Sequence, residues 1–373
     1  MSRATAAVLL AVTIFGLTYG LSAPLIALRL AAQGYSEAVI GANAAMHALG
    51  VLLIAPFLSA LYRYFSPRML LTGALATAAC LLMLFPLLPV WCGFLLRLLL
   101  GMATELILVV TETWLNQQSA ERRRAKTLAT YTAMLSLGFA LGPVILSLQG
   151  AGFGAFVSAA ALSLAAALSL MRTPLLRLQS QTPGQRSLTA WIGVMPLALA
   201  ATVLNAALET AGMNLLALYA MKQGWPEAEA TSLIAILLFG AIVLQLPVGW
   251  LADRFDRRRL VVTLAALSTL GALAWPPALH YPWLARLLLF CWGGAFVGIY
   301  TLILTLVGQR FQGAELAGAF AALSVAWGVG ALAGPALGGA AMTLSRQGLP
   351  WLAALLYAAF TLFAVTRRES DRI

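Results

Sequence analysis

Residues 249 to 260 read GWLADRFDRRRL and crowd six charged side chains between two apolar segments. The residues before them, 232 to 248, contain no charged side chain, and the chain after Leu260 is again mostly apolar. A helix needs roughly 20 apolar residues to cross the ~30 Å hydrocarbon core of a bilayer. This stretch is therefore predicted to be a turn at a membrane surface, joining two transmembrane helices.

The whole chain has the composition of a membrane protein. Of its 373 residues 62% are apolar and only 9% are charged, and the mean hydropathy is +0.91, whereas soluble domains carry about 25% charged residues. We predict an all-α membrane protein with twelve transmembrane helices. The predicted spans are residues 5–31, 37–61, 69–87, 91–114, 127–148, 152–171, 189–220, 229–251, 260–275, 283–307, 315–341 and 350–365.

The net charge of +11 is distributed unevenly across the membrane. When the predicted spans are threaded alternately through a bilayer, most of the 23 Lys and Arg residues fall on one side. The other side receives Arg29, Lys222 and Arg346, while Arg97 and Arg286 lie within spans. Because short cytoplasmic loops carry an excess of basic residues, both termini are predicted in the cytoplasm. The basic charge therefore does not indicate a nucleic-acid partner.

An internal repeat divides the chain. Three pairs of segments match at a spacing of about 190 residues: QGYSE 33–37 with QGWPE 223–227, RLLL 97–100 with RLLL 286–289, and LGFALGP 137–143 with VGALAGP 329–335. We predict six helices in residues 1–171, a cytoplasmic linker in 172–188, and six helices in 189–373. Since each half has an even number of spans, both halves enter the membrane in one orientation, as in transporters with a substrate path between parallel repeats.

The turn at Gly249 also resembles a known sequence signature. Gly249, Asp253, Arg254, Arg257 and Arg258 fit the pattern G-x-L-A-D-[RK]-x-G-R-[RK], the signature loop of the major facilitator superfamily, with Asp256 in place of the usual Gly. The equivalent loop of the first half, residues 59–68, lacks the leading Gly and the Asp. The segments LQLPVGWLADRF and 112–131 look like the bacterial YcaD-type branch of that family. The resemblance covers the entire chain and implies the major facilitator fold.

The charged turn is predicted to act as a cytoplasmic gate. Asp253 lies at the inner end of the eighth span, and the pseudo-symmetry of such folds would bring it near the start of the fifth span. Free N–H groups and the helix dipole favour an anion there. By the same logic Glu112 would meet Arg63 or Arg68. The gate residues are Gly249, Asp253, Arg254, Arg257, Arg258, Glu112, Arg63 and Arg68.

Acidic side chains deep in the membrane are candidates for proton coupling. A charge at the bilayer centre costs about 2.5 to 3.5 kcal/mol on insertion scales and usually faces a polar cavity. Glu105 and Glu209 lie at such depths, one in each half. The alternative is a structural ion pair, for example between Glu105 and Arg97 on the same helix. His47 could titrate, bind substrate or hydrogen-bond to a neighbouring helix.

Other polar residues are candidates for the substrate path. Tyr19, Asn205 and Asn214 fall on the first and seventh spans, which the family resemblance implies to line the path. Arg97 and Arg286 either pair with acids or hold an anionic group of the cargo.

Small residues and prolines in the fifth and eleventh spans predict close helix packing and bending. These packing and hinge candidates are Gly138, Gly142, Pro143, Gly330, Gly334 and Pro335. The eleventh span carries the full G-x-x-x-G-P-x-x-G-G pattern that the resemblance associates with proton antiporters, whereas residues 144–146 replace the glycine tail in the fifth. The pattern favours efflux over uptake.

The chain lacks the sequence motifs of nucleotide-driven pumps and of membrane hydrolases. The chain contains no G-x-x-x-x-G-K-[ST], G-x-S-x-G or H-E-x-x-H sequence, so neither an enzyme nor a cofactor or metal is predicted. We expect a monomeric, multi-pass protein of the bacterial inner membrane. Its partners are lipid, protons and a small solute that it moves by alternating access. A passive facilitator and a transport-inactive receptor or scaffold remain the alternatives.

Overall fold

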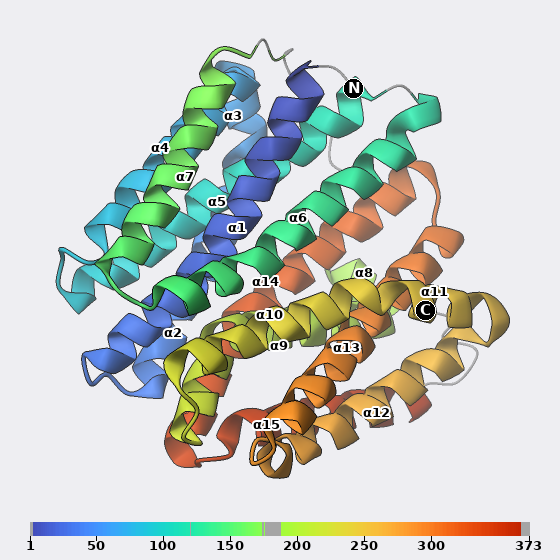
Figure 1. Ribbon diagram of the computed structural model, residues 1–373. Helices are drawn as coiled ribbons and strands as arrows, with labels where there is room; N and C mark the ends of the chain where they lie inside the picture. The colour runs from blue at the N-terminus through green and yellow to red at the C-terminus, as the bar shows by residue number, and fades with distance from the viewer. Residues whose placement is uncertain (1–2, 120, 174, 176–187, 367–373) are drawn as a thin grey trace. The chain divides into compact units, whose positions relative to one another are not determined.

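The computed structural model describes residues 3–119, 121–173, 175 and 188–366, and within these residues it contains helices and no strands. Figure 1 shows the arrangement of the helices. The elements are α1 (Arg3–Ala32), α2 (Glu37–Ile54), η1 (Ala55–Phe57), α3 (Leu58–Tyr64), α4 (Pro67–Leu84), α5 (Val90–Gln118), α6 (Glu121–Gln149), α7 (Phe153–Met171), α8 (Leu188–Val194), α9 (Pro196–Lys222), α10 (Glu227–Val243), α11 (Gln245–Arg254), α12 (Arg257–Ala278), α13 (Pro282–Arg310), α14 (Gly313–Leu344) and α15 (Gly348–Thr366).

The predicted number of membrane spans is confirmed, because the described residues contain 12 helical segments long and apolar enough to cross a bilayer. Three predicted spans are divided into shorter helices. Residues 37–61 run through α2, η1 and α3, and residues 229–251 run through α10 and α11. The seventh span, expected at residues 189–220, consists of two helices that are separated at Met195. Met195 has φ −141° and ψ 56°, outside the helical region. The physical reason is Pro196, which disfavours a helical conformation in the residue before it.

The turns at Gln33–Gly34 and Gln223–Gly224, called the QG turns here, have the same backbone structure. Gly34 and Gly224 have φ of +83° and +97°, a conformation that glycine adopts without the steric penalty of a side chain. A helix begins three residues later in each case, α2 at Glu37 and α10 at Glu227. The sequence match therefore reflects a match in local structure.

The two basic turns, residues 59–68 and 249–260, also correspond, because in each of them a side chain caps the helix that follows. Ser66 caps α4 by accepting a hydrogen bond from Met69 N at 3.3 Å, and Asp256 caps α12 by accepting one from Arg259 N at 2.8 Å. Such side-chain caps satisfy the free N–H groups of a helix start. One acid of GWLADRFDRRRL is thus a helix cap.

Arginines in the same turns bind the ends of other helices. Arg68 donates to the carbonyl of Met171 in α7 at 3.5 Å, and Arg258 donates to the carbonyl of Ala364 in α15 at 3.2 Å. Each contact satisfies a carbonyl in the last turn of a helix, where cations are favoured. A pair of contacts at corresponding places therefore ties α4 to α7 and α12 to α15.

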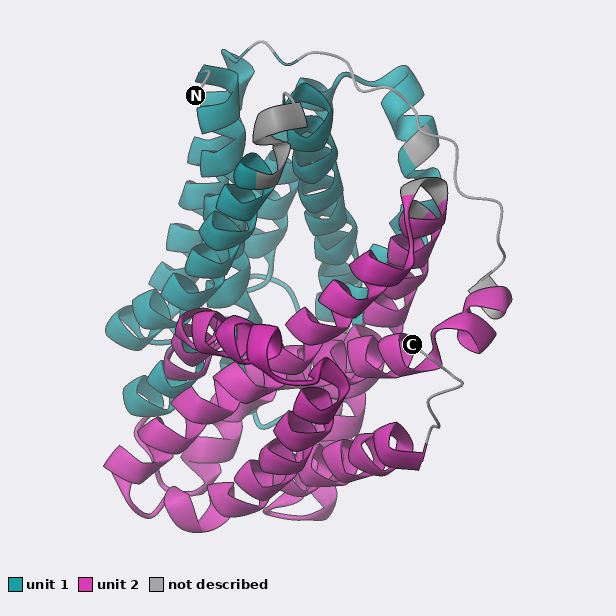
Figure 2. Cartoon of the chain, turned by 90° about the vertical axis from the view of Figure 1, so that its right-hand side faces the viewer, with its two compact units in different colours: residues 1–35, 46–181, 227–235 teal, residues 36–45, 182–226, 236–373 magenta. Residues whose placement is uncertain are grey.

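The chain divides by contacts into two compact units, which Figure 2 colours separately. Unit 1 comprises residues 1–35, 46–181 and 227–235, and unit 2 comprises 36–45, 182–226 and 236–373. In unit 1, α1 packs mainly on α6 and α4 on α7, whereas in unit 2, α9 packs on α14 and α12 on α15. Most of the predicted linker, residues 172–188, lies outside the described residues.

Glycines allow the closest helix contacts within each unit. A methyl group built on Gly138 of α6 would lie 2.4 Å from the Thr13 carbonyl oxygen of α1. The same construction on Gly334 of α14 would lie 2.0 Å from the Ala207 carbonyl oxygen of α9. Gly142 meets α1 and Gly330 meets α9 in the same way. Pro143 and Pro335 lie inside α6 and α14, which continue past them.

Candidate functional site

A buried polar cluster in unit 1 combines residues from three helices. Tyr19 of α1 lies against His47 of α2 with ring centroids 5.0 Å apart. His47 Nε2 is 3.1 Å from the hydroxyl of Thr104 in α5. The guanidinium of Arg97, also in α5, acts electrostatically on His47 and interacts with Tyr19. His47 is 8% exposed and Arg97 1% exposed. Three predicted site residues are thus brought together.

A second polar group in unit 1 contains the acids of α5. Glu105 and Glu112 are seven residues apart, which places them on one face of the helix. Both carboxylates act electrostatically on Tyr62 of α3 and Tyr131 of α6. Burial raises the pKa of Tyr62 to about 12, and the charges of the two acids contribute to that increase. The electrostatic neighbours of Glu105 therefore include Glu112 and these two phenols.

Helix α9 carries the polar residues of unit 2. Asn205 donates from Nδ2 to Glu209 Oε2 at 3.4 Å, one helical turn away. Asn214 donates to the carbonyl of Thr210 at 2.8 Å. Asn205 and Asn214 are each 3% exposed, but Glu209 is only partly buried. Of these three side chains, that of Glu209 is therefore the least buried.

Arg286 of α13 lies beside Trp225, in the turn that precedes α10. Its guanidinium is 5.7 Å from the ring of Trp225, within the range of a cation–π contact. Trp225 in turn donates to the carbonyl of Leu279 at 3.0 Å. Arg286 and Arg97 match in sequence, but they have different surroundings.

The gate residues of the signature turn lie on α11 and the start of α12. Asp253 is 80% exposed and its carboxylate is 4.0 Å from the guanidinium of Arg257. Arg254 stacks over the ring of Trp250 at 3.7 Å. Gly249 has open space beside its Cα. Within unit 2, Asp253 is thus held loosely and its carboxylate can accept another partner.

The structure does not bring Glu112 together with Arg63 or Arg68 in an ion pair among the residues that it describes. All three side chains are exposed, and Arg68 donates to the end of α7 instead. The pseudo-symmetry of the fold had suggested this pairing. Glu112 instead acts electrostatically on Tyr62 and Tyr131.

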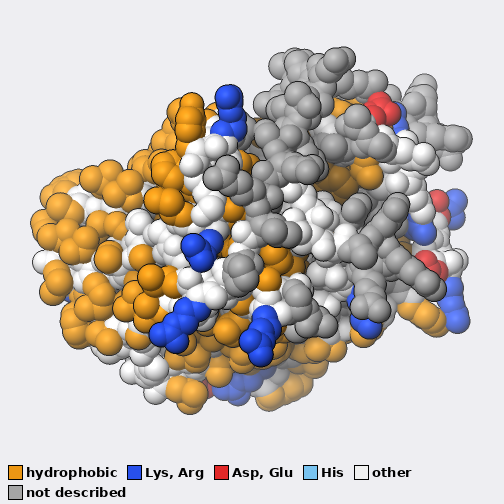
Figure 3. All heavy atoms as spheres, turned by 90° about the horizontal axis from the view of Figure 1, so that it is seen from above, with side chains coloured by type: hydrophobic (Ala, Val, Ile, Leu, Met, Phe, Trp, Pro, Cys, Tyr) orange, Lys and Arg blue, Asp and Glu red, His pale blue; other side chains and the backbone are white. Residues whose placement is uncertain are grey.

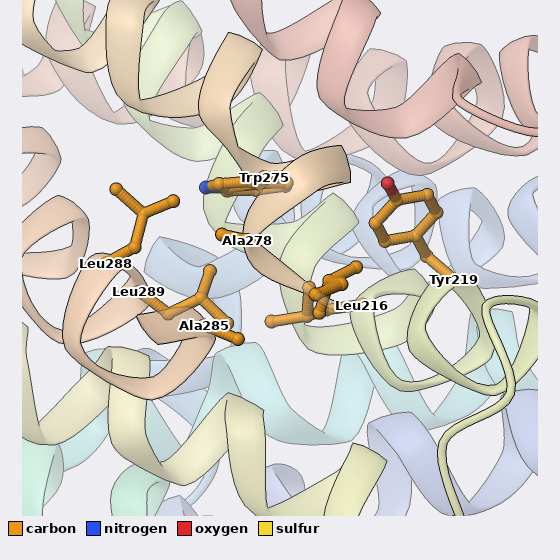
Figure 4. A pocket seen from close by; sticks show the side chains of 8 residues that line it. Leu216, Tyr219, Trp275, Ala278, Ala285, Leu288 and Leu289 are labelled. Carbon is orange, nitrogen blue, oxygen red and sulfur yellow. The ribbon is translucent and has the colours of Figure 1, made fainter. Parts of the chain in front are cut away.

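One cavity in unit 2 is too small for a cargo molecule (Figure 4). It is lined by Leu216, Tyr219, Trp275, Ala278, Leu279, Ala285, Leu288 and Leu289. The free space inside it is about 10 Å³, comparable with the ~10 to 15 Å³ that a single water requires. The lining is almost wholly apolar. This cavity therefore has neither the size nor the polar groups of a transport site.

The surface carries basic side chains on one face (Figure 3). Lys and Arg are more prominent there than Asp and Glu, among many exposed apolar side chains. In the described part of the chain, no three His, Cys, Asp or Glu side chains gather as metal ligands would.

Sequence reasoning missed several contacts. Thr104, next to Glu105, is a mid-span hydroxyl that could have been noticed. Two further contacts involve the matching glutamates of the QG turns. Glu37 pairs with Lys222 at 2.5 Å in unit 2, and Glu227 accepts a hydrogen bond from Ala151 N at 2.7 Å in unit 1. The repeat itself was the signal, because both acids end the matched segments.

Curated relatives are bacterial membrane proteins. The chain is 28% identical over 283 residues to the uncharacterized MFS-type transporter YfkF of Bacillus subtilis (strain 168), covering 70% of this chain and 69% of YfkF. It is 26% identical over 254 residues to the uncharacterized MFS-type transporter YcaD of Escherichia coli (strain SE11). That match covers 66% of this chain and 64% of YcaD, so it spans somewhat less than two thirds of that relative.

Solved structures share the fold at low identity. A point mutant of the nucleoside transporter NupG superposes with a TM-score of 0.81 and 15% identity, over 98% of this chain and 99% of NupG. The D-xylose-proton symporter gives a TM-score of 0.76 and 15% identity, over 99% and 98% of the two chains. A bacterial homologue of the human lysosomal transporter Spinster gives 0.79 and 15%, over 100% and 99%. These likenesses establish the fold.

A family model matches the chain twice, over residues 8–207 and 190–372. The two matches together extend through nearly all of the sequence, and each corresponds to about one half of the repeat. The expected resemblance is thereby confirmed. The chain belongs to the Major Facilitator Superfamily.

Proposed function

We propose that this protein is a secondary active transporter that moves a small solute across the bacterial inner membrane by alternating access. Two six-helix halves, residues 1–171 and 189–373, would rock about the solute, with the linker and both termini in the cytoplasm. Family membership supports transport, and the asymmetry of Lys and Arg supports this orientation. The protein would act as a monomer in the lipid bilayer.

The observation that carries proton coupling is the pair of partly buried mid-span acids. Glu105 in unit 1 and Glu209 in unit 2 are both partly accessible, in contrast to the nearly buried His47. A carboxyl group at this depth is neutral when protonated and charged when deprotonated. Its protonation state therefore changes the free-energy cost of holding that group within the membrane. A potential of 100 mV contributes roughly 2.3 kcal/mol per charge. Glu209, hydrogen-bonded only weakly to Asn205, is the stronger candidate.

We also propose that Asp253 takes part in a cytoplasmic gate. Asp253 is exposed and has a long contact with Arg257 in its own unit, which leaves its carboxylate available to a helix start when the inner face closes. The complete glycine pattern of α14 supports efflux in exchange for protons. A passive facilitator or a transport-inactive receptor is the competing function.

The test uses purified protein in vesicles loaded with a pH-sensitive dye. Compounds that raise the thermal stability of the protein are first selected, because ligands that bind the native state stabilise it. Each is then added outside the vesicles, and a proton-coupled transporter should change the internal pH. Cargo flux without a pH change would identify a passive facilitator. Binding without flux would identify a receptor.

A further inference from the structure

The cluster of Tyr19, His47, Arg97 and Thr104 contains a cation within the predicted fourth membrane span. Arg97 is 1% exposed, and its charge acts on His47 and interacts with Tyr19, both ordinarily neutral or weakly ionised groups. Charged residues at such depths are rare and are commonly found on substrate pathways. Arg97 thus places a guanidinium beside His47 and Tyr19 in this cluster.

His47 adds a buried polar atom that lacks a hydrogen bond. Its Nε2 faces Thr104, while Nδ1 has no partner among the described residues. Thr104 has one hydroxyl hydrogen, which is directed either to the carbonyl of Gly101 at 2.9 Å or to His47 Nε2 at 3.1 Å. If it is directed to Nε2, the neutral ring carries its hydrogen on Nδ1. His47 then presents a second N–H donor near the guanidinium.

We propose that this cluster recognises a carboxylate group of the transported solute. The proposal rests on the proposed transport function and names the chemical class of its cargo. A guanidinium binds a carboxylate through two parallel N–H bonds, and His47 supplies another donor when the Thr104 hydroxyl donates to Nε2 and the ring hydrogen is on Nδ1. One guanidinium with neutral donors balances a single negative charge, which favours a monocarboxylate over a doubly charged phosphate.

Tyr19 is the most exposed member of the cluster, whereas His47 and Arg97 are buried. Its ring packs against His47 and against Phe139 of α6, with centroids 5.0 and 5.6 Å apart.

The experiment compares carboxylates with matched neutral and cationic compounds. Benzoate, lactate and acetate are tested against benzamide, lactamide and benzylamine for their effect on the melting temperature of the full-length protein. We expect at least one of the carboxylates to stabilise the protein and its amide to have no effect. Stabilisation by the amides or the amine in place of the carboxylates, or by none of the compounds, would overturn the proposal.

Variants separate recognition from folding. Arg97→Lys keeps the charge but loses the planar fork, and should weaken carboxylate binding by roughly tenfold or more. His47→Gln is the second variant, in case Arg97→Lys fails to fold. Lys126→Gln removes an exposed charge of α6 and should bind like the wild type. Unchanged affinity in both cluster variants contradicts the proposal. Carboxylate binding without transport in vesicles would instead contradict the proposed function.

Discussion

The charged side chains of the turn at residues 249–260 make different contacts, although the sequence suggested one gate role for the whole turn. Asp256 caps α12, Arg258 binds the end of α15, and Arg254 stacks on Trp250. Asp253 is exposed and does not cap α12; its carboxylate has a 4.0 Å contact to Arg257. A surface pair of this kind contributes about 0 to 1 kcal/mol. This contact therefore contributes little to the stability of unit 2, and the proposed gate role assigns the carboxylate to contacts formed during transport.

Asp253→Asn should reduce transport strongly while changing the melting temperature little. The reason is that the substitution removes the charge that a helix start would bind when the inner face closes. In a variant lacking Cys80, Cys92 and Cys291, a cysteine at Val203 should be labelled faster from the cytoplasmic side. Asp256→Asn is the matched control, since asparagine also caps helices well. Equal labelling and flux in both variants would exclude the gate role.

Glu209→Gln should abolish proton-driven accumulation of the cargo but preserve its exchange across the membrane. Glutamine resembles the protonated acid and cannot release a proton, so the cycle loses its driving force but not its binding site. Accumulation in vesicles after a pH jump measures the effect. Glu105→Gln is the comparison on the opposite half. Full accumulation by both variants and by the double variant would transfer the coupling role to His47 or indicate a passive facilitator.

Among the elements, the pairs α1 with α6 and α9 with α14 are packed against each other through glycines. Inside a membrane, helices associate through close contact of their backbones more than through the burial of large apolar side chains. Gly138 and Gly334 occupy corresponding places in these pairs. The helices that carry Tyr19 and Glu209 are thereby held by similar interfaces in the two units.

Gly334→Ala should destabilise the protein by about 1 to 3 kcal/mol, as overpacking does in well-packed cores. The added methyl group would lie 2.0 Å from the Ala207 carbonyl oxygen, so α9 and α14 must move apart. Gly212→Ala in α9 is the control, because no atom lies within 4 Å of the added carbon. Thermal unfolding in detergent compares them. An equal effect of the two substitutions would show that the close contact is unimportant.

At the scale of the molecule, each unit contains a short helix segment from the other half of the sequence. Residues 36–45, which begin α2, belong to unit 2, and residues 227–235, which begin α10, belong to unit 1. In unit 2 this segment is held by the Glu37 to Lys222 ion pair and by Ala38 N donating to Thr343 Oγ1 at 3.1 Å. In unit 1 it is held by Glu227. By the predicted topology, both contacts lie on the side opposite the basic turns.

Reversing the charge of Glu37 or Lys222 alone should release the start of α2 from unit 2. Glu37→Lys and Lys222→Glu should each increase labelling of a cysteine at Val39 by an impermeant reagent on the outer side, again with the native cysteines replaced. The double variant restores opposite charges and should return labelling towards the wild-type level. The effect on stability should be small, since partly exposed pairs contribute about 0.2 to 1 kcal/mol. Failure of the double variant to restore protection would rule out the ion pair as the cause.

The sequence by itself determined the spans, the repeat and the turn at Gly249, because hydropathy and turn residues act locally and recur at a constant spacing. It also located Glu105, Glu209, His47 and Arg97 within spans. It did not predict the interruptions within three spans, of which the one at Met195 precedes Pro196.

Only the tertiary structure decided which polar residues meet. Thr104 and His47 are 57 residues apart in the chain, and Arg258 and Ala364 are 106 residues apart. A span's apolar pattern says little about its rotation or its neighbours, since helices in a uniformly apolar solvent are positioned by packing and hydrogen bonds to one another. Such contacts depend on the fold of the chain as a whole and leave no local signal in its sequence.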